Sequence, residues 1–280
     1  MSDFPSRTDE PYRPSRASAD TIGTANGDAR QQLFSMQRLI TPVELWSLCL
    51  QTMLARIGTV LAAVALGTVL SLALHALPQW GINTARLFRV FEWMVGTFTS
   101  LWIIFGAHDW LRGAGSRSGR DPRATAHPMA RAGQALGPGL LVNFLAYVLL
   151  VLGLILFIVP GVMAAVYVSL CLPIVALDQR RGTAALRRSR DLVLGRWGDV
   201  FARLVVLGLP FLIAFGVRIG ITLSFDPAWL DAFKSSPHLL SIGLLAYSFL
   251  TDLLVVPITV GTVILWHNLD ALQTEENKLS

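Results

Sequence analysis

The chain has 280 residues, of which 53% are hydrophobic and only 15% are charged. An average soluble domain has about 45–50% apolar and about 25% charged residues. The mean hydropathy of +0.55 requires long uncharged runs, and about 20 apolar residues in a row are needed to cross a hydrocarbon core of about 30 Å. This composition argues against a water-soluble enzyme and predicts an all-α, polytopic membrane helix bundle.

The N-terminal residues 1–35 are rich in Ser, Arg, Asp and Pro and contain no apolar run like the core of a signal peptide. We expect them to form a disordered cytoplasmic tail without a cleaved signal. A six-helix membrane domain is predicted over residues 36–270, followed by a cytoplasmic tail over residues 271–280. Cys49 and Cys171 lie in apolar stretches without metal-ligand spacing, so both are expected to be buried as small hydrophobic residues.

Six segments are apolar enough to be predicted as transmembrane helices. Their predicted ranges are 55–77, 88–110, 139–159, 161–177, 200–225 and 239–266. Pro160-Gly161 separates the third segment from the fourth, and this pair is a turn signal. One continuous helix over both would be about 54 Å long at 1.5 Å per residue, so we predict a tight hairpin.

Between the spans, amphipathic segments are predicted to lie on the cytoplasmic surface of the membrane. Thr41-Pro42-Val43-Glu44 has the pattern of a helix start with a capping box and Pro at the first position. A second such segment covers residues 124–136. A third is expected to be capped by Thr183 and to stop at Gly195.

The basic residues are distributed unevenly over the two sides of the membrane. With six spans, 19 of the 23 Lys and Arg residues fall on the side of the two termini. The other 4 are Arg86, Arg89, Arg218 and Lys234. Because cytoplasmic loops carry the excess of Lys and Arg, both termini are predicted to be cytoplasmic.

A stretch of about 50 residues, 159–207, carries a family resemblance. It reads Val159-Pro-Gly161, then Leu172-Pro173, Ala185-Leu-Arg-Arg-Ser189 and Gly195-Arg-Trp197. This order resembles the membrane domain beside some bacterial glycerophosphodiester phosphodiesterases and related stand-alone inner-membrane proteins of six spans. The resemblance implies a six-span fold in the bacterial inner membrane. In that family the phosphodiesterase activity belongs to a separate soluble barrel of about 200 residues or more, which is not expected here, so no catalytic residue is carried over.

Two groups of residues are candidates for a binding site. Arg187, Arg188 and Arg190 lie on the basic surface segment and are predicted to contact anionic lipid headgroups; the alternative is a solvated linker helix. Asp252 is the one ionisable residue near the middle of a span, where a carboxylate costs at least about 2.5–3.5 kcal/mol. It is either an ion-coupling group or a packing residue that hydrogen-bonds to a neighbouring helix.

Prolines inside the predicted spans strengthen the first interpretation of Asp252. Pro173, Pro210 and Pro257 each remove a helical hydrogen bond and are predicted to kink their helices. Transporters place broken helices at substrate sites. Asp252 lies five residues before Pro257. Glycines at spacing four, such as Gly216 and Gly220, are explained either by packing within one chain or by a homo-oligomer.

The predicted function is that of a non-enzymatic inner-membrane protein in envelope or lipid homeostasis, whose partners are membrane lipids. The alternative is a small transporter or channel that uses Asp252, Pro210 and Pro257. No nucleotide loop, zinc-spaced Cys/His set or nucleophile elbow is found in the sequence. We therefore expect no catalytic residues, cofactor, metal or nucleic-acid partner.

Overall fold

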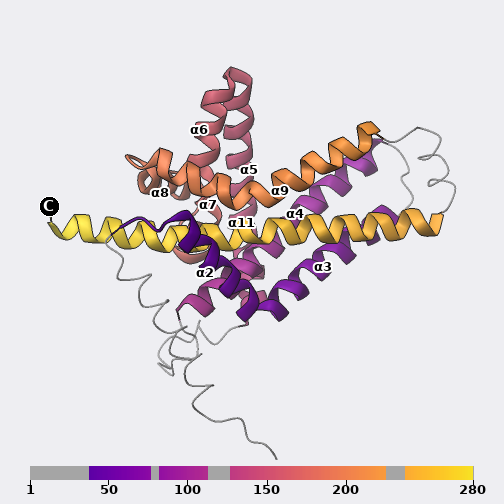
Figure 1. The fold of residues 1–280 in the computed structure, drawn as a ribbon, viewed down its shortest axis with the longest axis horizontal. Helices are drawn as coiled ribbons and strands as arrows, with labels where there is room; N and C mark the ends of the chain where they lie inside the picture. The colour runs from indigo at the N-terminus through magenta and orange to yellow at the C-terminus, as the bar shows by residue number, and fades with distance from the viewer. Residues whose placement is uncertain (1–37, 77–81, 113–126, 225–236, 280) are drawn as a thin grey trace, which may run out of the picture.

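The computed structural model describes residues 38–76, 82–112, 127–224 and 237–279, and over these ranges all regular secondary structure is α-helical (Figure 1). The helices are α2 (Pro42–Ala55), α3 (Ile57–Ala76), α4 (Ile82–Leu111), α5 (Pro128–Leu156), α6 (Ile158–Val168), α7 (Cys171–Leu177), α8 (Thr183–Val193), α9 (Trp197–Ser224) and α11 (Pro237–Leu279). The N-terminal tail predicted over residues 1–35 lies outside the described residues. The segment predicted as a C-terminal tail is helical through Leu279.

Within the residues that the structure describes, five stretches are long and apolar enough to cross a membrane: Leu87–Leu111, Pro128–Leu156, Ile158–Leu177, Trp197–Val217 and Phe249–Lys278. A sixth candidate is the pair Pro42–Ala55 and Ile57–Ser71, which is bent by 81° at Arg56. The chain is therefore an all-α, multi-pass membrane protein with five or six spans, and the predicted fold class is confirmed.

The start of α2 agrees with the predicted capping box. The Thr41 hydroxyl accepts a hydrogen bond from the Glu44 amide at 3.3 Å, and the Glu44 carboxylate accepts one from the Thr41 amide at 2.9 Å. Pro42 is the first helical residue, where its missing N–H would have no intrahelical partner anyway.

Two predicted boundaries of the surface segments are wrong. The part of segment 124–136 that the structure describes is the first turns of α5, which continues through Pro138 into the membrane span. Thr183 does not cap α8, because the cap position is Gly182, which has a φ of +55° and makes no side-chain cap bond. Gly195, with a φ of +82°, follows the end of α8 as predicted.

Helices α5 and α6 form the predicted hairpin, which projects away from the other helices (Figure 1). The turn is at Phe157, whose backbone is extended with a ψ of 160°. Pro160 and Gly161 lie in the first turn of α6, where Pro is tolerated. An added Cβ on Gly153 would lie only 2.9 Å from the Gly161 Cα, so the absence of side chains lets the two backbones touch.

The fourth span is broken between α6 and α7. Helix α6 ends at Val168 and α7 begins at Cys171. Pro173 follows the break, and its ring would clash with the carbonyl of Ser169, four residues earlier. Pro173 therefore coincides with a short interruption of the helix, while Ile158–Leu177 is still one span.

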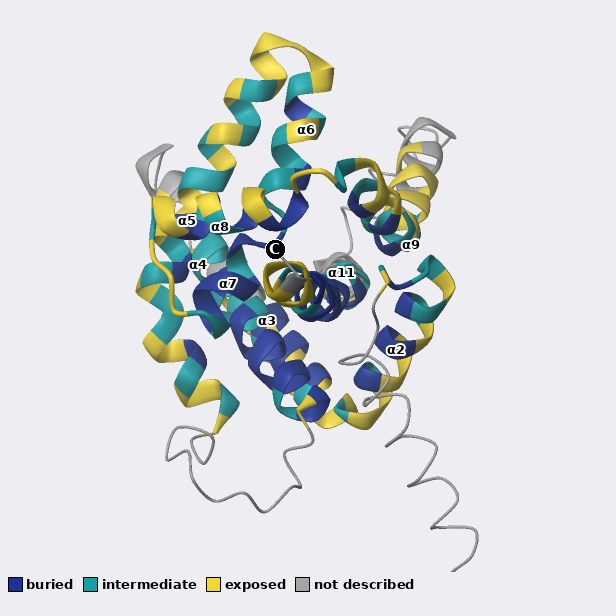
Figure 2. Ribbon diagram, turned by 90° about the vertical axis from the view of Figure 1, so that its left-hand side faces the viewer, coloured by how far each residue is buried: buried dark blue, intermediate teal, exposed yellow. Residues whose placement is uncertain are grey.

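Helix α11 runs through the centre of the molecule and contacts α2, α3, α4 and α9 (Figures 1 and 2). One hydrophobic core joins it to α2, α3 and α4, and a second joins its later turns to α6, α7, α8 and α9. Helices α9 and α11 approach closely at Gly261, where an added Cβ would clash with the methyl groups of Leu207.

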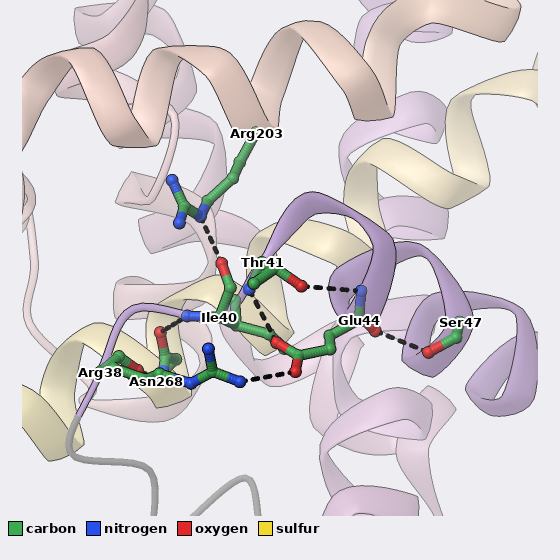
Figure 3. Close-up of polar contacts among 7 residues, drawn as sticks. All are labelled: Arg38, Ile40, Thr41, Glu44, Ser47, Arg203 and Asn268. Carbon is green, nitrogen blue, oxygen red and sulfur yellow. Dashed lines mark hydrogen bonds and ion pairs between the residues drawn. The ribbon is translucent and has the colours of Figure 1, made fainter.

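Residues 38–41 form a short strap that lies against α9 and α11 (Figure 3). The Ile40 amide donates a hydrogen bond to Asn268 Oδ1 at 3.0 Å, and Arg203 Nε donates to the Ile40 carbonyl at 2.6 Å. Ile40 and Asn268 are both fully buried. The chain just before α2 is therefore fixed to the two helices by its main chain.

Candidate functional site

A cavity of about 270 Å³ lies between α3, α4, α5 and α11. Its polar lining comes from Asp252 and Thr259 of α11, from Thr97, Thr99 and Ser100 of α4, and from Asn143 of α5. Its apolar lining includes Trp93 and several small or aliphatic residues. Among the described lining residues, Asp252 has the one ionisable side chain.

Asp252 connects α11 to α3 at this cavity. Its Oδ2 accepts a hydrogen bond from the Thr68 hydroxyl at 3.1 Å. The residue is exposed, although it lies inside a membrane-spanning stretch. Gly67 leaves room beside it, because an added Cβ there would lie 3.9 Å from Asp252 Oδ2. Both predicted alternatives find support here, since Asp252 bonds to a neighbouring helix and also opens onto a cavity.

The opposite wall of the cavity is a fixed chain of hydrogen bonds. Asn143 Nδ2 donates to Thr97 Oγ1 at 3.0 Å, and Thr97 Oγ1 donates to the Trp93 carbonyl at 2.9 Å. Thr99 Oγ1 similarly donates to the Gly96 carbonyl at 3.0 Å. These hydroxyl protons are directed to the backbone, so the oxygens of Thr97 and Thr99 can act only as acceptors toward any other group. Together with Asp252 they supply acceptor atoms among the lining residues.

A second acid, Glu92 of α4, bonds to a hydroxyl one helical turn farther along α3. The Ser71 hydroxyl donates to Glu92 Oε1 at 3.2 Å. Thr68 and Ser71 are three residues apart and share one face of α3. The two acid–hydroxyl pairs thus follow each other between α3 and its neighbours.

The two predicted prolines lie at different distances from the cavity. Pro257 is buried in α11 between the lining residues Val256 and Thr259. Pro210 lies inside α9, which contributes no lining residue. Both helices continue through their prolines. The structure therefore brings Asp252 and Pro257 to one site and leaves Pro210 outside it.

The three predicted lipid-binding arginines have different environments. Arg188 points into the protein, where its guanidinium bonds to Asp270 at 2.5 Å and to Gln273. It also lies 3.9 Å from Asp178. Arg187 and Arg190 are exposed on the opposite side of α8. The three residues therefore do not form one surface.

Asp178 shares this charged cluster at the end of α7. Burial and the nearby carboxylate of Asp270 raise the pKa of Asp178, while Arg188 and Arg180 act in the opposite direction. The two acids repel each other, and Arg188 lies within reach of both. The cluster joins α7, α8 and the last turns of α11.

Sequence reasoning missed the oxygen-bearing partners of Asp252 and also a buried histidine pair. His108 Nδ1 and His267 Nε2 are 3.0 Å apart, and both residues are less than 10% exposed. They join α4 to α11, and Arg131 bonds to Asp109 nearby at 2.6 Å. No group of three potential metal ligands occurs within the described ranges.

Comparison with known proteins gave no match to any family model, curated protein or solved structure. The resemblance to the phosphodiesterase-associated membrane domain stays a prediction.

Proposed function

We propose that this protein binds a small cation in the Asp252 cavity and carries it across the membrane. This is the second of the two functions predicted from the sequence, and a single observation carries it. A carboxylate in a membrane span opens onto a cavity whose other polar groups are hydroxyls and an amide. Ionisable residues are rare inside membrane spans, and those that occur there commonly mark the path of an ion or a substrate.

The charge of the lining favours a monovalent cation. The described lining residues include one acid and no Lys or Arg, so one positive charge would neutralise the site. Carboxylate, hydroxyl and carbonyl oxygens are the ligands that hard cations prefer. The aromatic ring of Trp93 also lines the cavity and suits an organic ammonium ion.

The orientation that we propose places both termini in the cytoplasm of a bacterial cell, with the protein in the inner membrane. The excess of Lys and Arg on that side supports it. In this orientation the Glu92–Ser71 pair lies on the outer side of Asp252, because α3 runs from the inside to the outside. A role in envelope or lipid homeostasis stays a prediction.

The test is ion flux into liposomes that contain the purified full-length protein. Proton flux is followed with an internal pH dye, and sodium, potassium and methylammonium uptake with radioactive tracers. Asp252→Asn keeps the shape of the side chain and removes its charge, so we expect it to abolish the flux. Glu275→Gln is the matched control, since Glu275 is an exposed acid on the same helix.

Two results would contradict the proposal. The first is a flux through Asp252→Asn equal to that of the unchanged protein. The second is the absence of flux of all four cations in correctly folded protein. A variant with an unchanged melting temperature and no flux would separate transport from packing.

A further inference from the structure

Helix α8 has two chemically distinct faces. Its buried face consists of Ala185, Ser189, Leu192 and Val193. Its exposed face carries Arg187 and Arg190. The turn that precedes α8 adds two more exposed cations, Arg180 and Arg181. Helix α8 and the turn before it therefore carry four exposed arginines, with Asp191 as the exposed acid of the same helix.

The rotation of α8 about its own axis is fixed from the inside. Arg188 bonds to Asp270 and Gln273 of α11. Ser189 donates a hydrogen bond to the Tyr167 carbonyl of α6 at 2.6 Å. These bonds hold the inner face against the protein, so Arg187 and Arg190 must face outward.

The basic turn lies beside an apolar surface of a membrane span. An added Cβ on Gly182 would be 3.9 Å from a methyl group of Leu141 on α5. Leu141 and Phe144 are 51% and 54% exposed, and they lie three residues apart on one face of α5. A large exposed apolar face on a span is the surface that acyl chains cover. The turn that carries Arg180 and Arg181 and leads into α8 therefore meets this apolar face.

We infer that Arg180, Arg181, Arg187 and Arg190 bind the headgroup of an anionic phospholipid whose acyl chains lie along Leu141 and Phe144 of α5. Juxtamembrane cations attract anionic headgroups, and the neighbouring apolar face supplies the contact for the chains. Arg188, which was predicted as part of the site, instead holds α8 in place. The inference is independent of the cation transport proposed above.

The experiment measures lipid retention by native mass spectrometry on the full-length protein. The protein is incubated with mixed micelles of phosphatidylglycerol and phosphatidylcholine in equal amounts. We expect phosphatidylglycerol to be retained preferentially. The double variant Arg187→Gln/Arg190→Gln should lower its affinity by about fivefold for each arginine removed. Both residues are exposed, so the melting temperature should not change.

A matched control removes the same charge elsewhere. Arg38 and Lys278 are exposed, and each is paired with a nearby acid, so Arg38→Gln/Lys278→Gln should retain the lipid normally. An equal loss in both double variants would overturn the inference, because net charge alone would then explain binding. Displacement of the lipid by inorganic phosphate would also overturn it, since the site would then accept free anions without the acyl-chain contact.

Discussion

The side chain of Asn268 holds the main chain of Ile40 to α11. Its Oδ1 accepts the Ile40 N–H at 3.0 Å, and its Nδ2 donates to the Arg38 carbonyl at 3.3 Å (Figure 3). The two residues are 228 positions apart in the chain. One amide side chain therefore satisfies both a donor and an acceptor of the strap, as a neighbouring β-strand would.

Removal of this amide should loosen the strap. Asn268→Ala leaves the buried Ile40 N–H without its acceptor, which costs about 1–3 kcal/mol. We expect a lower melting temperature and faster hydrogen exchange at Ile40. Gln51→Ala, at an exposed position of α2, is the control and should change neither. Unaltered hydrogen exchange at Ile40 in Asn268→Ala would show that the Asn268 side chain does not hold the strap.

The α5–α6 hairpin should depend on Gly153. Gly153→Ala places a methyl group 2.9 Å from the Gly161 Cα, and because the obstacle is backbone it cannot rotate away. Overpacking of this kind costs about 1–3 kcal/mol. The comparison is Gly133→Ala on the same helix, where an added Cβ meets nothing within 4 Å. That change should stabilise the protein by about 0.5–1 kcal/mol. The melting temperatures of the two variants are measured by thermal unfolding in the same detergent. Equal melting temperatures for Gly153→Ala and Gly133→Ala would contradict the close contact between the backbones.

The volume of the cavity can be reduced without a change in charge. Gly67→Val adds a branched side chain beside Asp252, where the Cβ would lie 3.2 Å from the Thr99 methyl group. If the cavity holds the transported cation, the liposome flux should fall severalfold while Asp252 stays intact. Gly58→Val is the control on the same helix, since its Cβ would meet nothing within 4 Å. A normal flux in Gly67→Val would mean that the ion does not pass through this space.

The pH dependence of stability should reveal Asp178. Its pKa is raised in the folded protein, mainly by burial and then by Asp270. As the pH falls, the folded state therefore binds a proton before the unfolded state does. Between the pKa of Asp178 in the folded protein and its lower pKa in the unfolded chain, protonation increases the stability of the fold. At neutral pH Asp178 is ionised, and its burial then lowers the free energy of unfolding by the largest amount. We expect Asp178→Asn to raise the melting temperature at pH 7.

The same difference should shrink as the pH falls toward 3.8, the ordinary pKa of an aspartic acid side chain, because Asp178 then becomes neutral in both states. A series of melting curves for the two proteins between neutral and acidic pH measures this. A difference that stays constant over that range would exclude the titration of Asp178 as its cause.

Local features were predicted well from the sequence, whereas contacts between distant segments were not. The capping box at Thr41 and Glu44 depends on residues three apart, and it is present. The turn of the hairpin is at Phe157 and not at Pro160-Gly161, because Pro fits the first turn of a helix as well as a loop. The start of α5 was missed because Pro138 does not end that helix.

The chemistry of the cavity depends on contacts that no local pattern carries. Thr68 reaches Asp252 across 184 residues, and Asn143 reaches Thr97 across 46. A threonine or an asparagine in a membrane helix can bond to any neighbouring helix, so the residue alone does not identify its partner. Arg188 is a second example. It is adjacent to Arg187 in the same basic run, and only the orientation of α8 against α11 shows that Arg188 faces Asp270.

Helix α11 has 43 residues, which at 1.5 Å per residue is a rod of about 65 Å. Asp252 near its middle, Asn268 farther along and Asp270 at the charged cluster all belong to this rod. A rotation of α11 that withdraws Asp252 from the cavity would also withdraw Asn268 from the strap and Asp270 from Arg188. The cavity, the strap and the inner face of α8 therefore all depend on one and the same rotational position of α11.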